Sequence, residues 1–471
     1  MHTIEQIFIN GEFVTPHGTE WFDLYNPATA RVIGQVRLAD EVDAERAIAA
    51  AKAAFPAWSQ TTKQERIAAL KRMHAAVAAR HDDLLEAVIE EYGAPASRSA
   101  WMASYPAEVI VQAIEALEAF AFVTPAGGAT VQMTPLGVAG LITPWNSDAG
   151  FICGKLAAAL AAGCTAVIKP SEMSALQTQI VTEALRDAAL PPGVFNIVTG
   201  RGETVGETIS RHPDVAKISF TGSTNTGKAI LRNAAESFKR VTLELGGKSP
   251  TILLDDVDLA QAIPLVIQAG FMNSGQACVA GTRILVPYSR KAEIETALAQ
   301  AVAAMKSGDP RNSTTDVGPM VSEKQWLRVQ GYIRKGIEEG ARLLAGGEGR
   351  PEGTRDGWFV RPTLFADVNN RMTIARDEIF GPVLCVIPYR DEAEAIAIAN
   401  DTDYGLSAMV LGGDVDRARR VAQQIVSGRV LVNTLAHEPK APFGGFKHSG
   451  VGREMGEWGI RAFMEPRSVL G

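Results

Sequence analysis

The sequence predicts an α/β protein in which two large domains pack closely against each other. Short apolar segments alternate with helical segments in residues 137–247 and again in residues 249–434, which indicates βαβ units and parallel sheets covered by helices on both faces. The length of 471 residues matches roughly three domains at about 150 residues each. No flexible Gly/Ser linker separates the two series, so we expect a cleft between tightly packed domains.

The segments before residue 137 predict a small β region followed by a block of helices. Residues 7–13 and 22–36 alternate apolar and polar side chains around Asn-Gly and Asn-Pro turns, a pattern typical of short strands. The polar sequence TPAGGATVQMTP at 124–135 predicts a hairpin. Apolar residues at three- and four-residue spacing, with acidic residues near the starts, predict helices at 41–58, 64–93 and 107–123.

The first alternating series also predicts where a ligand would bind. Ligands of such sheets sit at the carboxyl ends of the strands. The loops to consider are therefore PWNSDAG, KPSE, GRGE and FTGST, which follow expected strands. These strands are expected at 137–145, 165–170, 195–200, 216–222 and 240–247.

The second series predicts the other large domain. It begins with the apolar segment 249–271 and contains a helix expected at 292–305. No internal repeat or low-complexity tract interrupts it. Its strands, and a strand that closes the chain, are expected at 283–287, 362–368, 381–389, 428–434 and 462–470.

The charge balance excludes several classes of partner. The formal net charge is -7 and no Lys/Arg block occurs, so we expect neither a nucleic acid nor an anionic membrane as partner. The N-terminus lacks the basic and apolar segments of a secretory signal, and no run of about 18 uncharged apolar residues follows. We expect a cytoplasmic protein.

The four cysteines fall into two groups. Cys153, Cys164 and Cys385 lie in apolar contexts typical of small buried side chains. Cys278 lies instead in NSGQACVAGT, among small and polar neighbours. No CxxC motif or Cys/His cluster occurs, so we expect no metal site.

Cys278 is a candidate nucleophile, but its own context leaves a buried structural role open. Covalent chemistry at a thiol needs a base and a donor for the oxyanion. Glu244 ends an apolar strand before Gly-Gly, where a lone glutamate is often only solvated or ion-paired. Asn146 follows Pro-Trp at another strand end, where it could donate to an oxyanion or merely cap the next helix.

Two kinds of loop are candidates for holding a nucleotide. In VIKPSE, Lys169 and Glu172 follow a strand; a lysine can bond ribose hydroxyls or phosphate, and an acidic residue can hold ribose hydroxyls while repelling a 2′-phosphate. The turns GRGETVG and FTGSTNTG precede helices and suit a pyrophosphate. Neither matches G-x-G-x-x-G, and each alone is also typical of an ordinary βα turn.

Together these segments resemble the NAD(P)-dependent aldehyde dehydrogenase superfamily. The motifs PWN, KPSE, FTGST, ELGGKSP, GQACVAGTR, EIFGPVL and PFGGFKHSG occur in the family's order, and the resemblance covers nearly the whole chain. It implies a Rossmann-type cofactor domain, an α/β catalytic domain and a small β oligomerisation element, hence a homodimer or homotetramer. It places these parts at 1–119 with 139–245, at 246–460, and at 120–138 with 461–471.

The resemblance also implies the catalytic roles. Cys278 matches the nucleophile that forms a thiohemiacetal and, after hydride transfer, a thioester. Asn146 and the Cys278 amide match the oxyanion hole, and Glu244 matches the base that activates water, so the product would be a carboxylic acid. The alternatives are a CoA-acylating semialdehyde dehydrogenase, whose relatives typically lack this glutamate, and a non-catalytic dinucleotide-binding protein.

The cofactor implied by the resemblance is NAD, with NADP as the alternative because some members with this KPSE turn accept both. Glu172 favours NAD. The positions that match the family's cofactor contacts are Thr143, Trp145, Lys169, Ser171, Glu172, Gly202, Gly206, Phe220, Gly222, Ser223, Leu245, Glu378 and Phe380.

The expected substrate pocket departs from common members after Asn146, where many have an aromatic residue and proline and this chain has Ser147 and Asp148. Reduced bulk at Ser147 and Gly154 indicates room for an aromatic or longer aliphatic aldehyde. We expect no arginine there, and therefore an uncharged substrate, and a structural or surface role for His437. By position the pocket residues are Ser147, Phe151, Gly154, Met272, Leu435, His437 and Phe443.

Overall fold

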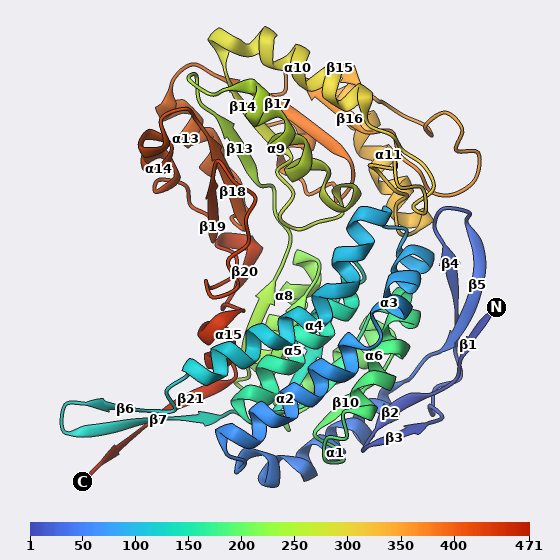
Figure 1. The fold of residues 1–471 in the computed structure, drawn as a ribbon, viewed down its shortest axis with the longest axis vertical. Coiled ribbons are helices and arrows are strands. Elements are labelled where there is room, and N and C mark those ends of the chain that lie inside the picture. The colour runs from blue at the N-terminus through green and yellow to red at the C-terminus, as the bar shows by residue number, and fades with distance from the viewer.

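A computed structural model describes residues 1–471 and confirms the predicted α/β class (Figure 1). The first large sheet has eight strands in the order β20-β12-β11-β8-β9-β10-β2-β3. Five consecutive strands, from β12 to β10, are parallel. Antiparallel pairings add β20 (Gly450–Val451) at one edge, and β2 (Ile7–Ile9) followed by β3 (Glu12–Val14) at the other. The parallel strands are β8 (Val138–Ile142), β9 (Thr165–Lys169), β10 (Phe195–Ile197), β11 (Val215–Thr221) and β12 (Arg240–Glu244).

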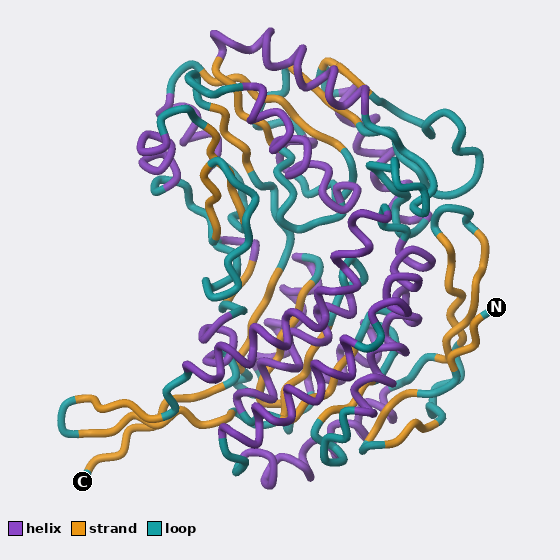
Figure 2. Tube along the Cα trace, viewed as in Figure 1, coloured by secondary structure: helices purple, strands orange, loops and turns teal.

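Helices cover both faces of this sheet, as the alternating pattern predicts (Figure 2). Successive residues of a strand point to opposite faces, so Leu141 packs into the core below one helical layer and Ile142 into the core below the other. The first layer contains α2 (Lys63–Ala78), α4 (Ala96–Ala119), α5 (Asp148–Ala162) and α6 (Ala175–Asp187). The second contains α1 (Glu41–Ser59), α7 (Glu207–Arg211) and α8 (Thr224–Ala235).

The second large sheet has seven strands in the order β15-β16-β17-β14-β13-β18-β19, all parallel except β15. Its strands are β13 (Pro250–Leu253), β14 (Arg283–Pro287), β15 (Arg342–Ala345), β16 (Thr363–Ala366), β17 (Val383–Tyr389), β18 (Ser407–Leu411) and β19 (Arg429–Val432). The helices α9 (Leu259–Phe271) and α10 (Lys291–Ala304) pack on one face. On the other face lie α11 (Glu323–Glu338), α12 (Thr373–Arg376), α13 (Glu392–Asn400) and α14 (Val415–Ala422).

A three-stranded antiparallel sheet projects from the body at the lower left of Figure 1. The predicted hairpin forms β6 (Val123–Ala126) and β7 (Ala129–Pro135), and the closing strand forms β21 (Met464–Leu470). β21 pairs with β7 along its whole length, from Met464 opposite Pro135 to Leu470 opposite Ala129. A second small sheet of β1 (His2–Ile4), β4 (Trp21–Asn26) and β5 (Arg31–Arg37) lies near the N-terminus.

One pairing links the two large domains beside a candidate catalytic residue. β20 lies in the part of the sequence assigned to the catalytic domain, yet it pairs with β12, with Gly450 opposite Glu244. On its other side Glu244 faces Thr221 of β11. Neighbouring strands therefore hold the backbone of Glu244 on both sides. The expected domain boundaries stay predictions. No helix in the chain is both long and apolar enough to cross a membrane.

Candidate active site

A cavity of about 390 Å³ lies where the two large domains meet, and it contains the three predicted catalytic side chains, Asn146, Glu244 and Cys278. Half of its 32 lining residues are hydrophobic, as is typical of pockets for small organic ligands. All seven predicted substrate residues line it: Ser147, Phe151, Gly154, Met272, Leu435, His437 and Phe443.

Asn146 is tied to the loop of the candidate nucleophile. Ser147, not Asn146, is the N-cap residue of α5. The Asn146 side-chain amide donates to the carbonyl oxygen of Gln276 at 3.1 Å, and the side chain of Asn273 donates to the Asn146 carbonyl at 3.2 Å. The structure therefore orients Asn146 toward the Cys278 loop and does not use its side chain as a helix cap.

The loop before Cys278 has an unusual backbone. Asn273 and Ser274 have φ of 57° and 58°, in the left-handed region that non-glycine residues rarely adopt. At Gly275, with φ of 75°, an added Cβ would lie 2.2 Å from the backbone of Gly381. A glycine is required there because two chain segments approach so closely. This contact fixes the cysteine loop against the EIFGP turn.

Cys278 is distinguished from the other cysteines by its position. Cys153, Cys164 and Cys385 are fully buried, which confirms their predicted place in the core. Cys278 is half-buried and lines the cavity. Burial raises the pKa of its thiol to about 12, and the carboxyl groups of Glu378 and Glu244 add to that shift. The free protein therefore holds Cys278 as the thiol at neutral pH.

Glu244 is buried without a partner. The residue is 4% exposed, and neither carboxyl oxygen accepts a hydrogen bond. Burial, followed by the nearby carboxylate of Glu454, raises the pKa of Glu244 well above its ordinary value. It is the cavity's one carboxyl group without an ion-pair partner, so once it is ionised it can accept a proton from a ligand or water.

A buried ion pair that was not predicted from the sequence lies beside Glu244. The Lys155 ammonium donates to Glu454 Oε1 at 2.5 Å and to Ser219 Oγ at 2.9 Å, and Ser219 also donates to Glu454 at 2.9 Å. Lys155 and Glu454 both line the cavity. The one signal in the sequence is a lysine inside the apolar helix FICGKLAAAL, because an unpaired charge would not be buried there.

Two arginines line the cavity. The expectation from the sequence that the pocket holds no arginine is wrong, because these are Arg98 of α4 and Arg429 of β19. Arg98 belongs to a helical face that also carries Trp101 and Tyr105. Their three- and four-residue spacing is visible in the sequence, but the same spacing also describes a core-facing stripe, so the cavity could not be inferred from it.

The predicted ribose contacts gather at the carboxyl ends of β8 and β9, away from this cavity. Lys169 lies 3.3 Å from one oxygen of Glu172, and Arg201 lies 3.4 Å from the other. Thr143 donates to Asp148 at 2.7 Å. Ser171 caps the turn that begins at Glu172. These contacts hold one lysine and one carboxylate side by side, as a ribose site needs.

Some of the other predicted cofactor positions are open to a ligand, and others are buried in the core. An added Cβ at Gly202 would meet open space, and Ser223 caps α8 through the amide of Thr226 at 3.3 Å. Phe220 and Leu245 are instead buried in the core of the first sheet. The Phe220 ring packs under Gly222, where an added Cβ would lie 2.4 Å from it. Phe220 and Leu245 therefore support the neighbouring turns.

Glu378 contacts the Gly-Gly turn that follows β12. It accepts from the Gly247 amide at 3.0 Å, and an added Cβ at Gly246 would lie 2.1 Å from its carboxylate. Burial raises the pKa of Glu378 to about 7. Phe380 has a φ of 60°, and its ring meets that of Trp145 edge-on at 5.4 Å.

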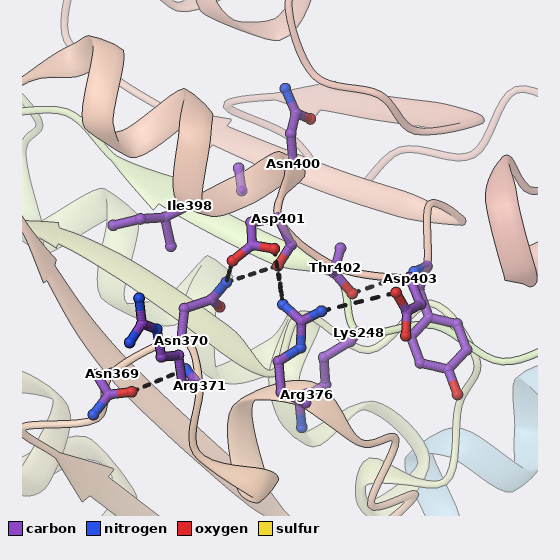
Figure 3. A network of polar contacts seen from close by, with 12 residues as sticks. Lys248, Asn369, Asn370, Arg371, Arg376, Ile398, Asn400, Asp401, Thr402 and Asp403 are labelled. Atoms are coloured by element: carbon purple, nitrogen blue, oxygen red, sulfur yellow. Dashed lines mark hydrogen bonds and ion pairs between the residues drawn. The ribbon is translucent and has the colours of Figure 1, made fainter.

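A polar network fixes the segment that leads to Glu378 (Figure 3). The Arg376 guanidinium lies 3.0 Å from the carboxylate of Asp401 and 3.8 Å from that of Asp403. Asn370 donates to the side chain of Asp401 at 2.9 Å. These contacts hold the end of α12, two residues before Glu378, so the strained turn at Phe380 starts from a fixed point.

Comparisons with known proteins show extensive similarity. The model of the aldehyde dehydrogenase family matches residues 13–469. The 3-succinoylsemialdehyde-pyridine dehydrogenase of a Pseudomonas species is 43% identical over 473 residues, which cover 100% of this chain and 99% of that protein. A variant of aldehyde dehydrogenase C from Pseudomonas syringae, solved with NAD+ and octanal, has a TM-score of 0.98 at 44% identity, covering 100% of this chain and 97% of the other. The Mycobacterium tuberculosis aldehyde dehydrogenase solved with NAD+ has a TM-score of 0.96 at 42% identity, covering 99% and 98%.

Proposed function

Because the chain belongs to the aldehyde dehydrogenase family, we propose that it oxidises an aldehyde to the carboxylic acid with NAD as cofactor. The observation that supports this reaction most directly is the gathering of Cys278, Glu244 and Asn146 in one cavity. A nucleophile, a free carboxyl group and an amide donor are the three groups that thioester chemistry needs.

The residues present fit NAD. Lys169 and Glu172 lie together at the ends of parallel strands, and the open space at Gly202 leaves room beside the backbone. NAD, when bound, supplies the acceptor for the hydride that leaves the aldehyde carbon. In the proposal Lys169 and Glu172 hold the adenosine ribose, while Glu378 and Phe380 hold the nicotinamide ribose.

The first covalent bond forms between Cys278 Sγ and the aldehyde carbon. The thiol loses its proton as it attacks, and Glu244 is the unpaired carboxyl group available to receive it once that group is ionised. The carbonyl oxygen becomes an oxyanion, which accepts from the Asn146 amide and the Cys278 backbone N–H. Loss of hydride from this thiohemiacetal leaves a thioester on Cys278.

Hydrolysis then releases the acid. Glu244, having passed the proton of the thiol to solvent, removes a proton from water as that water attacks the thioester carbon. The C–S bond then breaks, and the departing Cys278 thiolate takes the proton back from Glu244, which restores the thiol. Lys155 and Glu454 already neutralise each other beside Glu244. Glu244 is therefore the carboxyl group that remains to accept the proton from water. Water is therefore the acceptor of the acyl group, and CoA is not required.

The ligands and names of the relatives indicate what kind of group the substrate carries beside its aldehyde. The Pseudomonas syringae enzyme was solved with octanal, and the Pseudomonas relative is named for a pyridine semialdehyde. The cavity of this chain is half apolar and bordered by the small side chains of Ser147 and Gly154. The proposed substrate has an aromatic or longer aliphatic body. The expectation of an uncharged substrate required a pocket without arginine, and Arg98 and Arg429 line this one.

An assay of two variants beside the wild type tests the reaction. Cys278→Ala should abolish NADH formation with octanal or benzaldehyde while NAD binding, followed by calorimetry, is retained. Cys385→Ala, which changes a buried cysteine of β17, is the matched control and should keep activity. Turnover by Cys278→Ala, strict dependence on CoA, or NAD binding without turnover across an aldehyde panel would each refute the proposal.

A further inference from the structure

We infer that Arg98 is a specificity-determining residue that binds a carboxylate at the far end of the aldehyde substrate. The inference rests on the proposed function, because it assigns the other end of the same substrate. It names a substrate class: aldehydes whose apolar body ends in an anionic carboxylate.

Arg98 is poised in the cavity without a protein partner. Its guanidinium lies over the Trp101 ring at 3.8 Å, and that ring stacks on Tyr105 at 4.4 Å with 23° between the planes. The Arg98 side chain makes no hydrogen bond and no ion pair, and its Nε is buried. Stacking fixes the guanidinium plane while leaving its N–H groups free at the edge. Such donors normally find an acceptor when they are buried, and the cavity is where a ligand would supply one.

The charge of the cavity wall favours an anion. Glu454 is neutralised by Lys155, and burial favours the protonated form of Glu244. Arg429 makes no ion pair; its Nε donates to Ser407 at 3.3 Å, and its guanidinium lies 5.8 Å from the Phe443 ring centre. Two guanidinium groups therefore face the cavity without a compensating carboxylate.

A carboxylate matches this arrangement better than a neutral group. An arginine can offer a carboxylate two parallel N–H donors, whereas a ketone or ester oxygen is uncharged and gains less from them. The apolar side chains of Val109, Phe151 and Leu431 also line the cavity. They suit an aliphatic or aromatic spacer and cannot pair with a charge in its middle.

A matched set of substrates tests the inference on the intact enzyme. Octanal, 8-oxooctanoate and its methyl ester share a chain and differ in the far end. The wild type should have the highest kcat/KM for 8-oxooctanoate. Arg98→Met should lower that value roughly 10- to 100-fold, the range for lost hydrogen bonds to charged groups, and change the value for octanal less than about threefold. Arg98→Lys should fall between the two.

Gln112→Met is the control, because Gln112 lines the same cavity from the same helix without charge. It should leave the ratio between 8-oxooctanoate and its ester unchanged. A wild type that oxidises the ester as well as the acid, or an Arg98→Met variant that loses all three substrates equally, would overturn the inference while leaving the proposed function intact. No NADH formation from any aldehyde would instead overturn the proposed function.

Discussion

The side chain of Asn146 donates a 3.1 Å hydrogen bond to the carbonyl of Gln276, two residues before Cys278. The two residues are 130 positions apart in sequence, so the bond joins the end of β8 to the loop of the nucleophile. A side-chain amide carries two N–H donors. One is used for this tether, and the other stays free to meet an oxyanion on a carbon bound to Cys278.

This relationship predicts the effect of Asn146→Ala. The variant removes the tether and the free donor together, so kcat should fall roughly 10²- to 10³-fold, as for other oxyanion-hole donors. NAD affinity should stay within about twofold, because the ribose contacts lie elsewhere. Steady-state kinetics with octanal and calorimetric NAD titration measure the two effects. An unchanged kcat would remove Asn146 from the oxyanion hole.

The burial of Glu244 predicts a dependence of stability on pH. Its pKa in the folded protein lies well above the value in the unfolded chain, so the folded state holds the proton more tightly. The stabilising contribution of this group is fully present below the unfolded pKa, near pH 4, and is lost as the pH rises through the folded pKa. Ionising the buried carboxyl therefore destabilises the fold at higher pH.

Glu244→Gln should consequently raise Tm relative to wild type by roughly 1–3 °C at pH 9, with little or no gain at pH 5. Differential scanning fluorimetry across this range measures it. The control is Glu293→Gln, because Arg290 lowers the pKa of that exposed carboxyl, and no gain at pH 9 is expected there. A gain of equal size at both pH values would contradict the assignment of a buried, proton-binding carboxyl.

In rapid-mixing experiments Glu244→Gln should also give a larger NADH burst relative to its steady-state rate, because deacylation slows more than hydride transfer.

The sequence predicted most strands of the two large sheets, though not β15 or β18, and the resemblance predicted that Cys278, Glu244 and Asn146 meet, because both signals are local or ordered along the chain. Strand and helix periods are properties of short windows, and the motif around Cys278 is contiguous. The Lys155–Glu454 pair could not be predicted in the same way, since its members are 299 positions apart. The same holds for β20, whose two residues carry no strand pattern, and for Arg98, whose exposure to the cavity depends on how α4 packs.

The contacts of Glu172 predict how cofactor preference would change. Lys169 and Arg201 each approach one of its oxygens, at 3.3 and 3.4 Å. Glu172→Gln removes the negative charge that would repel a 2′-phosphate and releases both cations toward it. The ratio of kcat/KM for NADP to that for NAD should rise roughly tenfold or more, measured with a saturating aldehyde.

Glu20→Gln provides the matched control for that change. Glu20 lies 2.7 Å from Arg201, so this variant releases Arg201 while keeping the charge of Glu172. Its effect on the cofactor ratio should be smaller. Equal ratios for wild type and Glu172→Gln would mean that Glu172 does not face the adenosine ribose.

The projecting sheet predicts an oligomer. In the order β21-β7-β6 both β21 and β6 are edge strands, and Val469, Leu470 and Val123 are exposed on them. An exposed edge with apolar side chains is open to pairing with another chain, and closed symmetric assembly is the usual solution. The wild type should therefore have the mass of a dimer or tetramer in size-exclusion chromatography with light scattering. Deletion of residues 467–471 should shift the mass toward the monomer, whereas Val415→Lys, which changes an exposed valine of α14, should not. The deletion keeps Met464, which packs in the core with Phe463, so the subunit itself should keep its Tm within a few degrees. A monomeric wild type, or an unchanged mass after the deletion, would contradict assembly through this sheet.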